Sequence, residues 1–388
     1  MNRNTVRWII AALMLIALTL GLSYPSLAED GKLPLDYRMG GYPPVQGGWT
    51  WTYEDEEGTQ RTSGRYEEKA KKTLTGAEYS DPTISVSLTR GTVKHDVKGG
   101  KKNQSHEYFI VRIKINDVSQ LRTAASNDEY KGSGAISEEM ASDKLAVVAM
   151  NGDYFKGGNR DAGYLVRQGE LIRDNTGNKR KRIFDMLLID SEGDFHVIPS
   201  ATTENINAFV KETLEPQGRT ILDTFNLGPA LIVNGEVQET KNSEAARQGE
   251  YQWCYPQQRV AIAQIGPLEY AIIEVYGKTN SSFGMTTQEF AEFIAEYCPD
   301  VITAYNLDGG GSSRVICSEY SNPKNEVFAS YEELYGDYAE GLSKKEISNL
   351  KRIRNQLVTS TRVCVTPGGD RDIHDLIYFA SAYNSLQQ

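Results

Sequence analysis

Residues Thr286 to Ser313 read TTQEFAEFIAEYCPDVITAYNLDGGGSS, and they contain the signals of a helix, a strand and a glycine-rich loop in succession. Thr286 and Glu289 form a capping box, and apolar residues then recur at helical spacing until Pro299 ends the helix. The apolar run 301–304 is typical of a buried strand. A loop at the end of such a strand is a frequent position for an active site.

The loop that follows this strand carries groups of opposite character. Three consecutive glycines let backbone N–H groups approach a ligand closely, and a concave array of N–H groups favours an anion. Asp308 supplies a carboxylate that can accept a proton, hold a sugar hydroxyl or bind a cation. The alternative is an ordinary turn in which Asp308 only caps its own backbone. The candidate substrate-binding residues of the loop are Asn306, Gly309, Gly310, Gly311, Ser312 and Ser313.

A second candidate site follows the apolar strand predicted over 145–149. Asn151, Gly152 and Asp153 place an amide, a glycine and a carboxylate at its end. If this strand neighbours the strand before Asp308 in one sheet, the two sites are neighbours as well. An ordinary turn, in which Asn and Gly tolerate positive φ, is the alternative.

Two charged residues lie on apolar strands. Arg259 opens the strand 260–262, where a guanidinium can hold a phosphate by two hydrogen bonds, and a solvated edge charge is the alternative. Glu274 lies in an otherwise apolar strand. It is either a surface position of an alternating strand or a buried acid with a raised pKa, and we expect the surface position.

The first residues indicate export. Arg3 and Arg7 precede an uncharged stretch from Trp8 to Ala28, which ends in the small residues 26–28. This pattern is typical of a signal peptide, and an uncleaved membrane anchor over residues 8–28 is the alternative. We therefore expect an extracellular or cell-surface protein that meets the membrane only through this segment. The formal charge of −10 argues against nucleic acid as a partner.

The four cysteines are Cys254, Cys298, Cys317 and Cys364. In an exported chain disulfides are the first expectation, and a bridge between Cys317 and Cys364 would join the two ends of the polar segment 318–363. Free buried thiols are the alternative. The wide spacing shows no zinc pattern.

Period-two alternation of apolar residues starts at Ile84–Leu88 and recurs over 109–115, and Asn234-Gly235 is a strong hairpin signal. A second helix is expected from Ser343. These patterns predict an α+β fold with a β-rich, mixed or antiparallel sheet core and a few packed helices. The predicted division of the chain is a signal peptide or anchor at 1–28, an N-terminal extension or linker at 29–80, and a catalytic domain at 81–388 with an excursion at 318–363.

Six motifs occur in an order that resembles the phosphodiester glycosidase family, which includes the lysosomal uncovering enzyme and exported bacterial proteins linked to exopolysaccharide. In chain order the motifs are Asn151-Gly-Asp-Tyr-Phe, Phe225-Asn-Leu-Gly-Pro-Ala-Leu-Ile, Arg259-Val-Ala-Ile, Gly284-Met-Thr-Thr, Asn306-Leu-Asp-Gly-Gly-Gly-Ser-Ser and Arg371-Asp-Ile-His-Asp-Leu-Ile-Tyr-Phe. The resemblance covers roughly residues 140 to 380. It implies hydrolysis of a sugar 1-phosphodiester, such as a GlcNAc-1-phosphodiester, of cell-surface or extracellular glycans.

The chain departs from the family pattern at three places. Asp153 stands where a small residue is frequent, Lys278 replaces the Arg of an Asp-Gly-Arg element, and Ala263 replaces a Gly. These departures concern the identity of the substrate more than the fold.

The resemblance and the residue chemistry together suggest roles. Asp308 is the expected catalytic carboxylate, which activates water or stabilises an oxocarbenium-like centre, and Asp153 or Asp375 is the second acid. The glycine amides and Arg259 hold the phosphate, Asn151 orients a sugar hydroxyl, and Arg371 is a further substrate-binding residue. No cofactor is required by this scheme, although a carboxylate pair can also hold Ca²⁺ or Mg²⁺ beside a phosphate. The competing functions are a non-catalytic carbohydrate-binding or cell-wall protein and a phosphodiesterase acting on envelope polymers.

Overall fold

The computed structural model describes residues 40–95, 104–126, 130, 134–153, 163–177, 185–240, 255–277, 284–321, 343, 345, 359–364 and 371–383. The predicted signal peptide or anchor and nearly all of the helix predicted from Ser343 lie outside these residues. Within them, no helix is long and apolar enough to cross a membrane.

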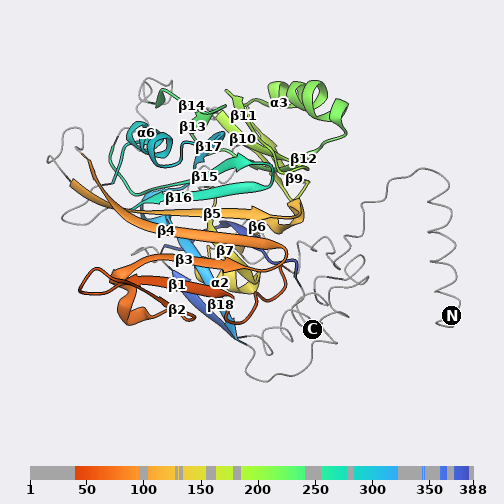
Figure 1. Ribbon diagram of the computed structural model, residues 1–388. Helices are drawn as coiled ribbons and strands as arrows, with labels where there is room; N and C mark the ends of the chain where they lie inside the picture. The colour runs from red at the N-terminus through yellow and green to blue at the C-terminus, as the bar shows by residue number, and fades with distance from the viewer. Residues whose placement is uncertain are drawn as a thin grey trace, which may run out of the picture. The chain divides into compact units, whose positions relative to one another are not determined.

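The largest sheet has ten strands, and every neighbouring pair in it is antiparallel. The strand order is β14-β13-β17-β15-β16-β5-β4-β3-β1-β2, and most of these strands can be followed in Figure 1. Their bounds are β1 (Trp49–Glu54), β2 (Gln60–Ser63), β3 (Leu74–Ser80), β4 (Ile84–His95), β5 (Gln104–Ile115), β13 (Ala230–Val233), β14 (Glu236–Val237), β15 (Arg259–Gly266), β16 (Glu269–Val275) and β17 (Thr303–Asn306).

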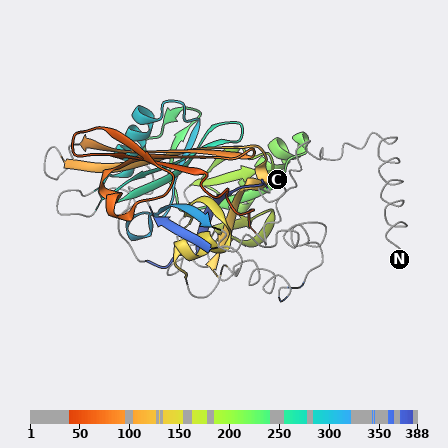
Figure 2. The ribbon, with the colours of Figure 1, turned by 60° about the horizontal axis from the view of Figure 1, so that its bottom comes forward.

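A second antiparallel sheet has the strand order β19-β18-β7-β20-β6 and comes forward in Figure 2. Its strands are β6 (Leu121–Ala125), β7 (Ala146–Asn151), β18 (Val315–Ser321), β19 (Thr359–Cys364) and β20 (Asp375–Ala380). Val148 and Phe379 of this sheet share one buried cluster with Trp51 and Ile272 of the ten-stranded sheet. The central core therefore lies between the two sheets.

Two helices cover the outer faces of this pair of sheets. Phe290 and Ile294 of α6 (Thr287–Tyr297) pack with Ile273 of the ten-stranded sheet. Met140 of α2 (Ser137–Asp143) packs with Leu376 of the five-stranded sheet. Each sheet is thus buried on both faces over part of its area.

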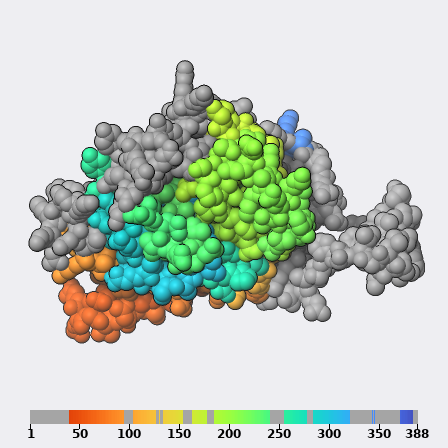
Figure 3. Space-filling view, turned by 90° about the horizontal axis from the view of Figure 1, so that it is seen from above, coloured from red at the N-terminus to blue at the C-terminus, as the bar shows by residue number. Residues whose placement is uncertain are grey.

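A smaller unit stands between β7 and β13 in the chain. It contains the hairpin β8 (Gly163–Arg167) and β9 (Glu170–Asn175), a three-stranded sheet of β10 (Asp185–Asp190), β11 (Phe195–Pro199) and β12 (Ile221–Phe225), and the helical segments α3 (Thr203–Phe209), η5 (Val210–Leu214) and η6 (Glu215–Gln217). Figure 3 shows these helical segments, in green, at the surface of the molecule. The remaining short helices are η1 (Glu68–Thr73), η2 (Val118–Gln120) and η8 (Gly310–Ser312).

The prediction of a β-rich core with antiparallel sheets is confirmed, and the described fold is mostly β. The helix after Thr286 has the predicted capping box, with Glu289 N donating to Thr286 Oγ1 and Glu289 Oε2 accepting from Thr286 N. Asn234 and Gly235 both adopt positive φ and join β13 to β14, as the hairpin signal predicts.

The structure corrects the prediction that residues 29–80 form an extension or linker. Residues 49–80 contain β1, β2 and β3 of the ten-stranded sheet. Trp49, Trp51 and Tyr53 are buried in the central core. The alternation of these three aromatic residues is the strand signal, but charged and glycine residues around it obscure the pattern in the sequence.

The predicted excursion at 318–363 begins within β18 and ends within β19, and these two strands pair with each other. Residues 322–342, 344 and 346–358 lie outside the described residues. Cys298 is a free buried thiol, and Cys317 is buried in β18. The free thiol of Cys298 contradicts any disulfide that includes this residue. Cys254 and the side chain of Cys364 are not described, so a bridge between Cys317 and Cys364 stays a prediction.

Candidate functional site

The two predicted loops meet, although their strands belong to different sheets. Asn151 Nδ2 at the end of β7 donates to Asp308 O at 2.6 Å, and Asn151 Oδ1 accepts from Arg314 N at 3.0 Å. Asp308 N donates to Gly152 O at 3.3 Å. The glycine loop leaves β17 in the ten-stranded sheet and enters β18, which pairs with β7. The loop is therefore the crossover between the sheets, and Asn151 fixes both of its ends.

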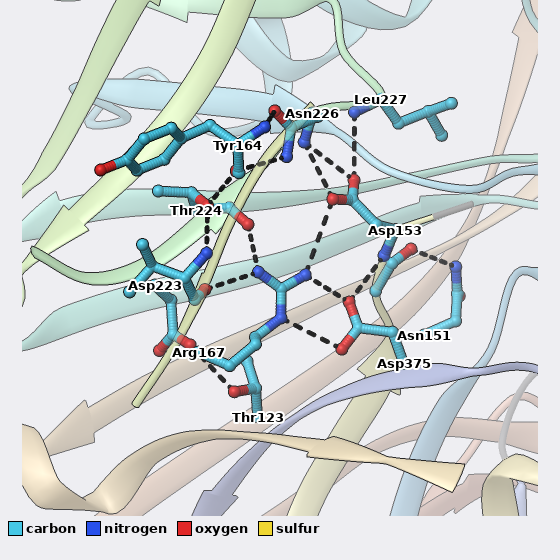
Figure 4. A network of polar contacts seen from close by, with 12 residues as sticks. Thr123, Asn151, Asp153, Tyr164, Arg167, Asp223, Thr224, Asn226, Leu227 and Asp375 are labelled. Carbon is cyan, nitrogen blue, oxygen red and sulfur yellow. Dashed lines mark hydrogen bonds and ion pairs between the residues drawn. The ribbon is translucent and has the colours of Figure 1, made fainter. Parts of the chain in front are cut away.

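A buried guanidinium, that of Arg167, lies at the centre of a network of polar contacts that includes Asp153 and Asp375 (Figure 4). Arg167, at the end of β8, donates from Nη2 to Asp375 Oδ2 at 2.7 Å and from Nε to Asp375 Oδ1 at 3.3 Å. Its Nη2 lies 3.6 Å from Asp153 Oδ2. Its Nη1 donates to the main-chain oxygens of Val166 and Thr224. The Arg167 and Asp375 side chains are 2% and 0% exposed, so this ion pair is closed to water.

Asp153 joins the Arg167 cluster to the turn after β12. Its carboxylate accepts from Asn226 N at 2.9 and 3.1 Å and from Leu227 N at 3.0 Å. Burial raises the pKa of Asp153 to about 6, the nearby Asp375 adds to this effect, and Arg167 opposes it. Asp153 therefore takes up a proton close to neutral pH.

Gly152 is required by a close approach of the chain to Asp375. Gly152 N donates to Asp375 O at 2.9 Å. A Cβ at position 152 would stand 2.4 Å from Asp375 Oδ2, which is far inside van der Waals contact. Only glycine fits this position without a shift of the buried carboxylate.

A further carboxylate, Asp223, is buried beside the same cluster. It accepts from Thr123 Oγ1 at 2.9 Å, from Gln168 N at 3.1 Å and from Gln168 Nε2 at 3.1 Å. Burial raises its pKa to about 6, with Arg167 acting in the opposite direction. Through these contacts Asp223 joins β6 to the small unit.

The backbone of the glycine loop lies against Gln258. Gly310 has a φ of +63° and donates from N to Gln258 O at 2.9 Å. A Cβ at Gly309 would lie 2.6 Å from Gln258 O. Positive φ and this close approach explain why glycines occupy these two positions.

Arg371 is the exposed cation beside the loop. Its Nη1 donates to Ser312 Oγ at 3.4 Å, and a Cβ at Gly311 would lie 3.5 Å from its Nη2. Ser312 and Ser313 are buried. Of the predicted binding groups, the backbone at Gly311 and the Arg371 side chain lie together at the outside of the loop.

Two other predicted binding residues contact the main chain instead. Arg259 is buried, and it donates from Nε to Met285 O at 2.9 Å and from Nη2 to Tyr255 O at 2.8 Å. Asn306 is buried and donates from Nδ2 to Gly228 O at 2.8 Å. These contacts hold the segments before α6 and before β13.

The structure thus brings together the following predicted residues: Asn151, Gly152, Asp153, Asp308, Gly309, Gly310, Gly311, Ser312, Arg371 and Asp375. Arg167 was not predicted. The only sequence signal for it is a charge that ends the apolar strand from Tyr164 to Val166. In the described part of the chain, no group of three or more His, Cys, Asp or Glu side chains is placed to hold a metal ion.

Residues 144–334 match the model of the phosphodiester glycosidase family. The matched part of the chain carries Asn151, Arg167 and Asp308. The chain is similar to the catalytic domain of zebrafish N-acetylglucosamine-1-phosphodiester α-N-acetylglucosaminidase, which is described as auto-inhibited by its pro-peptide. The identity is 14% over 91% of this chain and 99% of the zebrafish domain, with a TM-score of 0.50, so the likeness shows a shared fold.

Two further solved structures are less similar. A hypothetical protein from Synechocystis is 14% identical over 66% of this chain and 61% of its own, with a TM-score of 0.41. A protein from Burkholderia pseudomallei K96243 is 12% identical over 74% of this chain and 76% of its own, with a TM-score of 0.39. A comparison with curated protein sequences gives no match.

Proposed function

We propose that this protein is an exported glycosidase that hydrolyses a sugar 1-phosphodiester between the anomeric carbon and the phosphate oxygen. The match of residues 144–334 to the family model supports the hydrolase class. The observation that carries the proposal is the position of Asp308, a half-buried residue whose main chain is held by Asn151 and Gly152. It belongs to the same loop as Gly311 and Ser312, against which the exposed Arg371 side chain lies.

Asp308 is the carboxylate that acts on the substrate. The two carboxylates beside Arg167 are more buried, because the Asp375 side chain is 0% exposed and the Asp153 side chain 6% exposed. Phosphate is a good leaving group, so the reaction needs a carboxylate that activates water or stabilises positive charge at the anomeric carbon. The half-buried position of Asp308 supports this role.

The phosphate is held at the outside of the glycine loop by Arg371 and the amides of Gly309 and Gly311, because Gly310 N already donates to Gln258 O. Arg371 lies over Gly311 and Ser312 and is exposed. Arg259 is less suited to this role, because its guanidinium is buried and donates to Met285 O and Tyr255 O. Arg371 therefore replaces Arg259 as the preferred phosphate ligand of this chain.

Asp153 is the preferred second carboxylate. It is the less buried of the two that surround Arg167, and its pKa of about 6 lets it exchange a proton near neutral pH. Asp375 acts through Arg167, which it holds by two hydrogen bonds. No step of this scheme uses a metal ion, and activity unchanged by excess chelator is the expected result.

The N-terminal segment supports export. Arg3 and Arg7 precede the uncharged stretch 8–28, as in a signal peptide or an anchor. The proposed substrate is accordingly a sugar phosphodiester of a cell-surface or extracellular glycan.

The test is a panel of sugar 1-phosphodiesters incubated with the protein, with both products identified. We expect a free reducing sugar and a phosphate ester of the other partner. Asp308→Asn should lower kcat/KM by about 10²–10⁴-fold while the circular dichroism spectrum is unchanged. Saturable glycan binding without product would show a carbohydrate-binding protein, and phosphate retained on the sugar would show a phosphodiesterase. Either result would overturn the proposal.

A further inference from the structure

Glu274 is a fully buried acid, in contrast to the surface position expected from its sequence. It is 0% exposed on β16 and pairs with Val260 on one side and Phe109 on the other. Val260 and Phe109 both belong to the central core between the two sheets. An acid at such a position is costly to bury, so its hydrogen-bond partners should explain its presence.

The partner of Glu274 is the residue that supports the glycine loop. Gln258 Nε2 donates to Glu274 Oε1 at 2.5 Å and also lies 3.5 Å from Ser313 O. The main-chain oxygen of Gln258 accepts from Gly310 N at 2.9 Å. Gln258 thus contacts the loop in its middle, at Gly310, and near its end, at Ser313, and Glu274 holds the Gln258 side chain.

We propose that Gln258 and Glu274 are positioning residues that set the curvature of the glycine loop. Gln258 contacts the loop, Glu274 contacts Gln258, and neither contacts the substrate, so they act by placing the backbone amides of Gly309 and Gly311. This inference rests on the proposed function only in assigning phosphate to those amides. It means that Glu274, an acid in the core, controls how tightly the glycine loop binds an anion.

The main test compares Glu274→Met with Glu274→Gln. Methionine removes the acceptor for Gln258 Nε2, whereas glutamine keeps an acceptor oxygen of the same reach. For the methionine variant we expect kcat/KM to fall roughly 10- to 100-fold, mainly through a raised KM. We also expect loss of the increase in melting temperature that inorganic phosphate produces in the wild type. The glutamine variant should recover most of both properties.

Gln264→Met is the matched control for a purely structural effect. Gln264 lies on the same strand, β15, is buried, and donates to Asp194 Oδ1 at 2.8 Å. Its Oε1 also accepts from Phe195 N at 2.9 Å. The variant therefore loses buried and part-buried hydrogen bonds to residues 194 and 195, neither of which belongs to the loop. We expect this control to lose stability but to keep its KM and its response to phosphate.

A second variant covers the case in which Glu274→Met does not fold. Gln258→Asn shortens the amide by one methylene and separates it from Glu274 without removing a polar group. A folded variant of either kind with wild-type KM and wild-type phosphate response would overturn the proposal. Because phosphate binding is measured without turnover, the result holds even if no sugar phosphodiester is hydrolysed, which would contradict the proposed function alone.

Discussion

Arg167 allows two carboxylates to be buried next to each other. It forms two hydrogen bonds with Asp375 and lies 3.6 Å from Asp153. The guanidinium carbon of Arg167 also lies over the Phe225 ring, 4.3 Å from its centroid. Removing this cation leaves two buried acids without their main counter-charge, which is a large cost in a core of this kind.

We therefore expect Arg167→Met to lower the free energy of unfolding by about 3–5 kcal/mol. Arg371→Met makes the same exchange at an exposed position and should change it by less than about 0.5 kcal/mol while raising KM for the phosphodiester. Denaturant unfolding and steady-state kinetics measure the two effects. Equal stability losses at both positions would contradict the assignment of Arg167 as the buried counter-charge of Asp153 and Asp375.

The pKa of Asp153 predicts how stability depends on pH. Burial raises the folded-state pKa of Asp153 to about 6 from its ordinary value of 3.8, so the folded state holds this proton more tightly than the unfolded state. The stabilisation from proton binding is present below about pH 4 and is lost as the pH rises to about 6. The resulting change in the free energy of unfolding amounts to at most about 3 kcal/mol.

Asp153→Asn should remove this contribution. The unfolding free energy of the wild type minus that of the variant should fall between about pH 4 and pH 6 and stay constant above. Asp223 and Asp375 lie nearby in both proteins, so the difference isolates Asp153. A difference that does not vary with pH would contradict the raised pKa.

Some of these residues could be predicted from local sequence signals, and others could not. Asn151 and Asp308 are recognisable because glycines accompany them at the ends of apolar strands. Arg167 is not, since its partner Asp375 lies 208 positions away in the chain. Glu274 was expected at the surface, because alternation along a strand does not say which faces a second sheet or a helix will cover.

The glycine loop is an element whose position depends on both sheets. It connects β17 to β18, and Asn151 at the end of β7 holds it from the side. Helix α6 could be predicted because its capping box and its Pro stop are local signals. The pairing of β18 with β7 could not, because it depends on contacts between distant parts of the chain.

We predict that Gly152→Ala displaces Asp375 and, with it, Arg167. The new Cβ would stand 2.4 Å from Asp375 Oδ2, and the overpacking should cost about 1–3 kcal/mol and lower activity. Gly177→Ala is the matched control, since nothing lies within 4 Å of a Cβ there. Thermal unfolding and kinetics test the pair. A Gly152→Ala variant with wild-type stability and wild-type activity would contradict this prediction.

The whole molecule extends beyond the part that matches the family. The strands β1 to β3 precede residue 144, yet they complete the ten-stranded sheet and bury Trp49 and Trp51. Trp49 Nε1 donates to Ser318 O at 2.9 Å, and Trp51 Nε1 donates to Glu319 Oε1 at 2.5 Å. These bonds tie the first strand to β18, the strand that follows the glycine loop.

Removal of residues 1–80 should therefore expose the core and abolish cooperative unfolding. A chain that begins at residue 40 keeps β1 to β3 and is the control. Solubility and near-ultraviolet circular dichroism distinguish the two. A shorter chain that unfolds with native cooperativity would restore the interpretation of residues 29–80 as a linker.

The most direct measurement of the proposed reaction is the fate of water oxygen during turnover of a sugar 1-phosphodiester in H₂¹⁸O. If Asp308 acts at the anomeric carbon, the C–O bond breaks, and the label should appear in the hydroxyl group of the released sugar. Label in the phosphate product would show that the P–O bond breaks instead, and would contradict the glycosidase account.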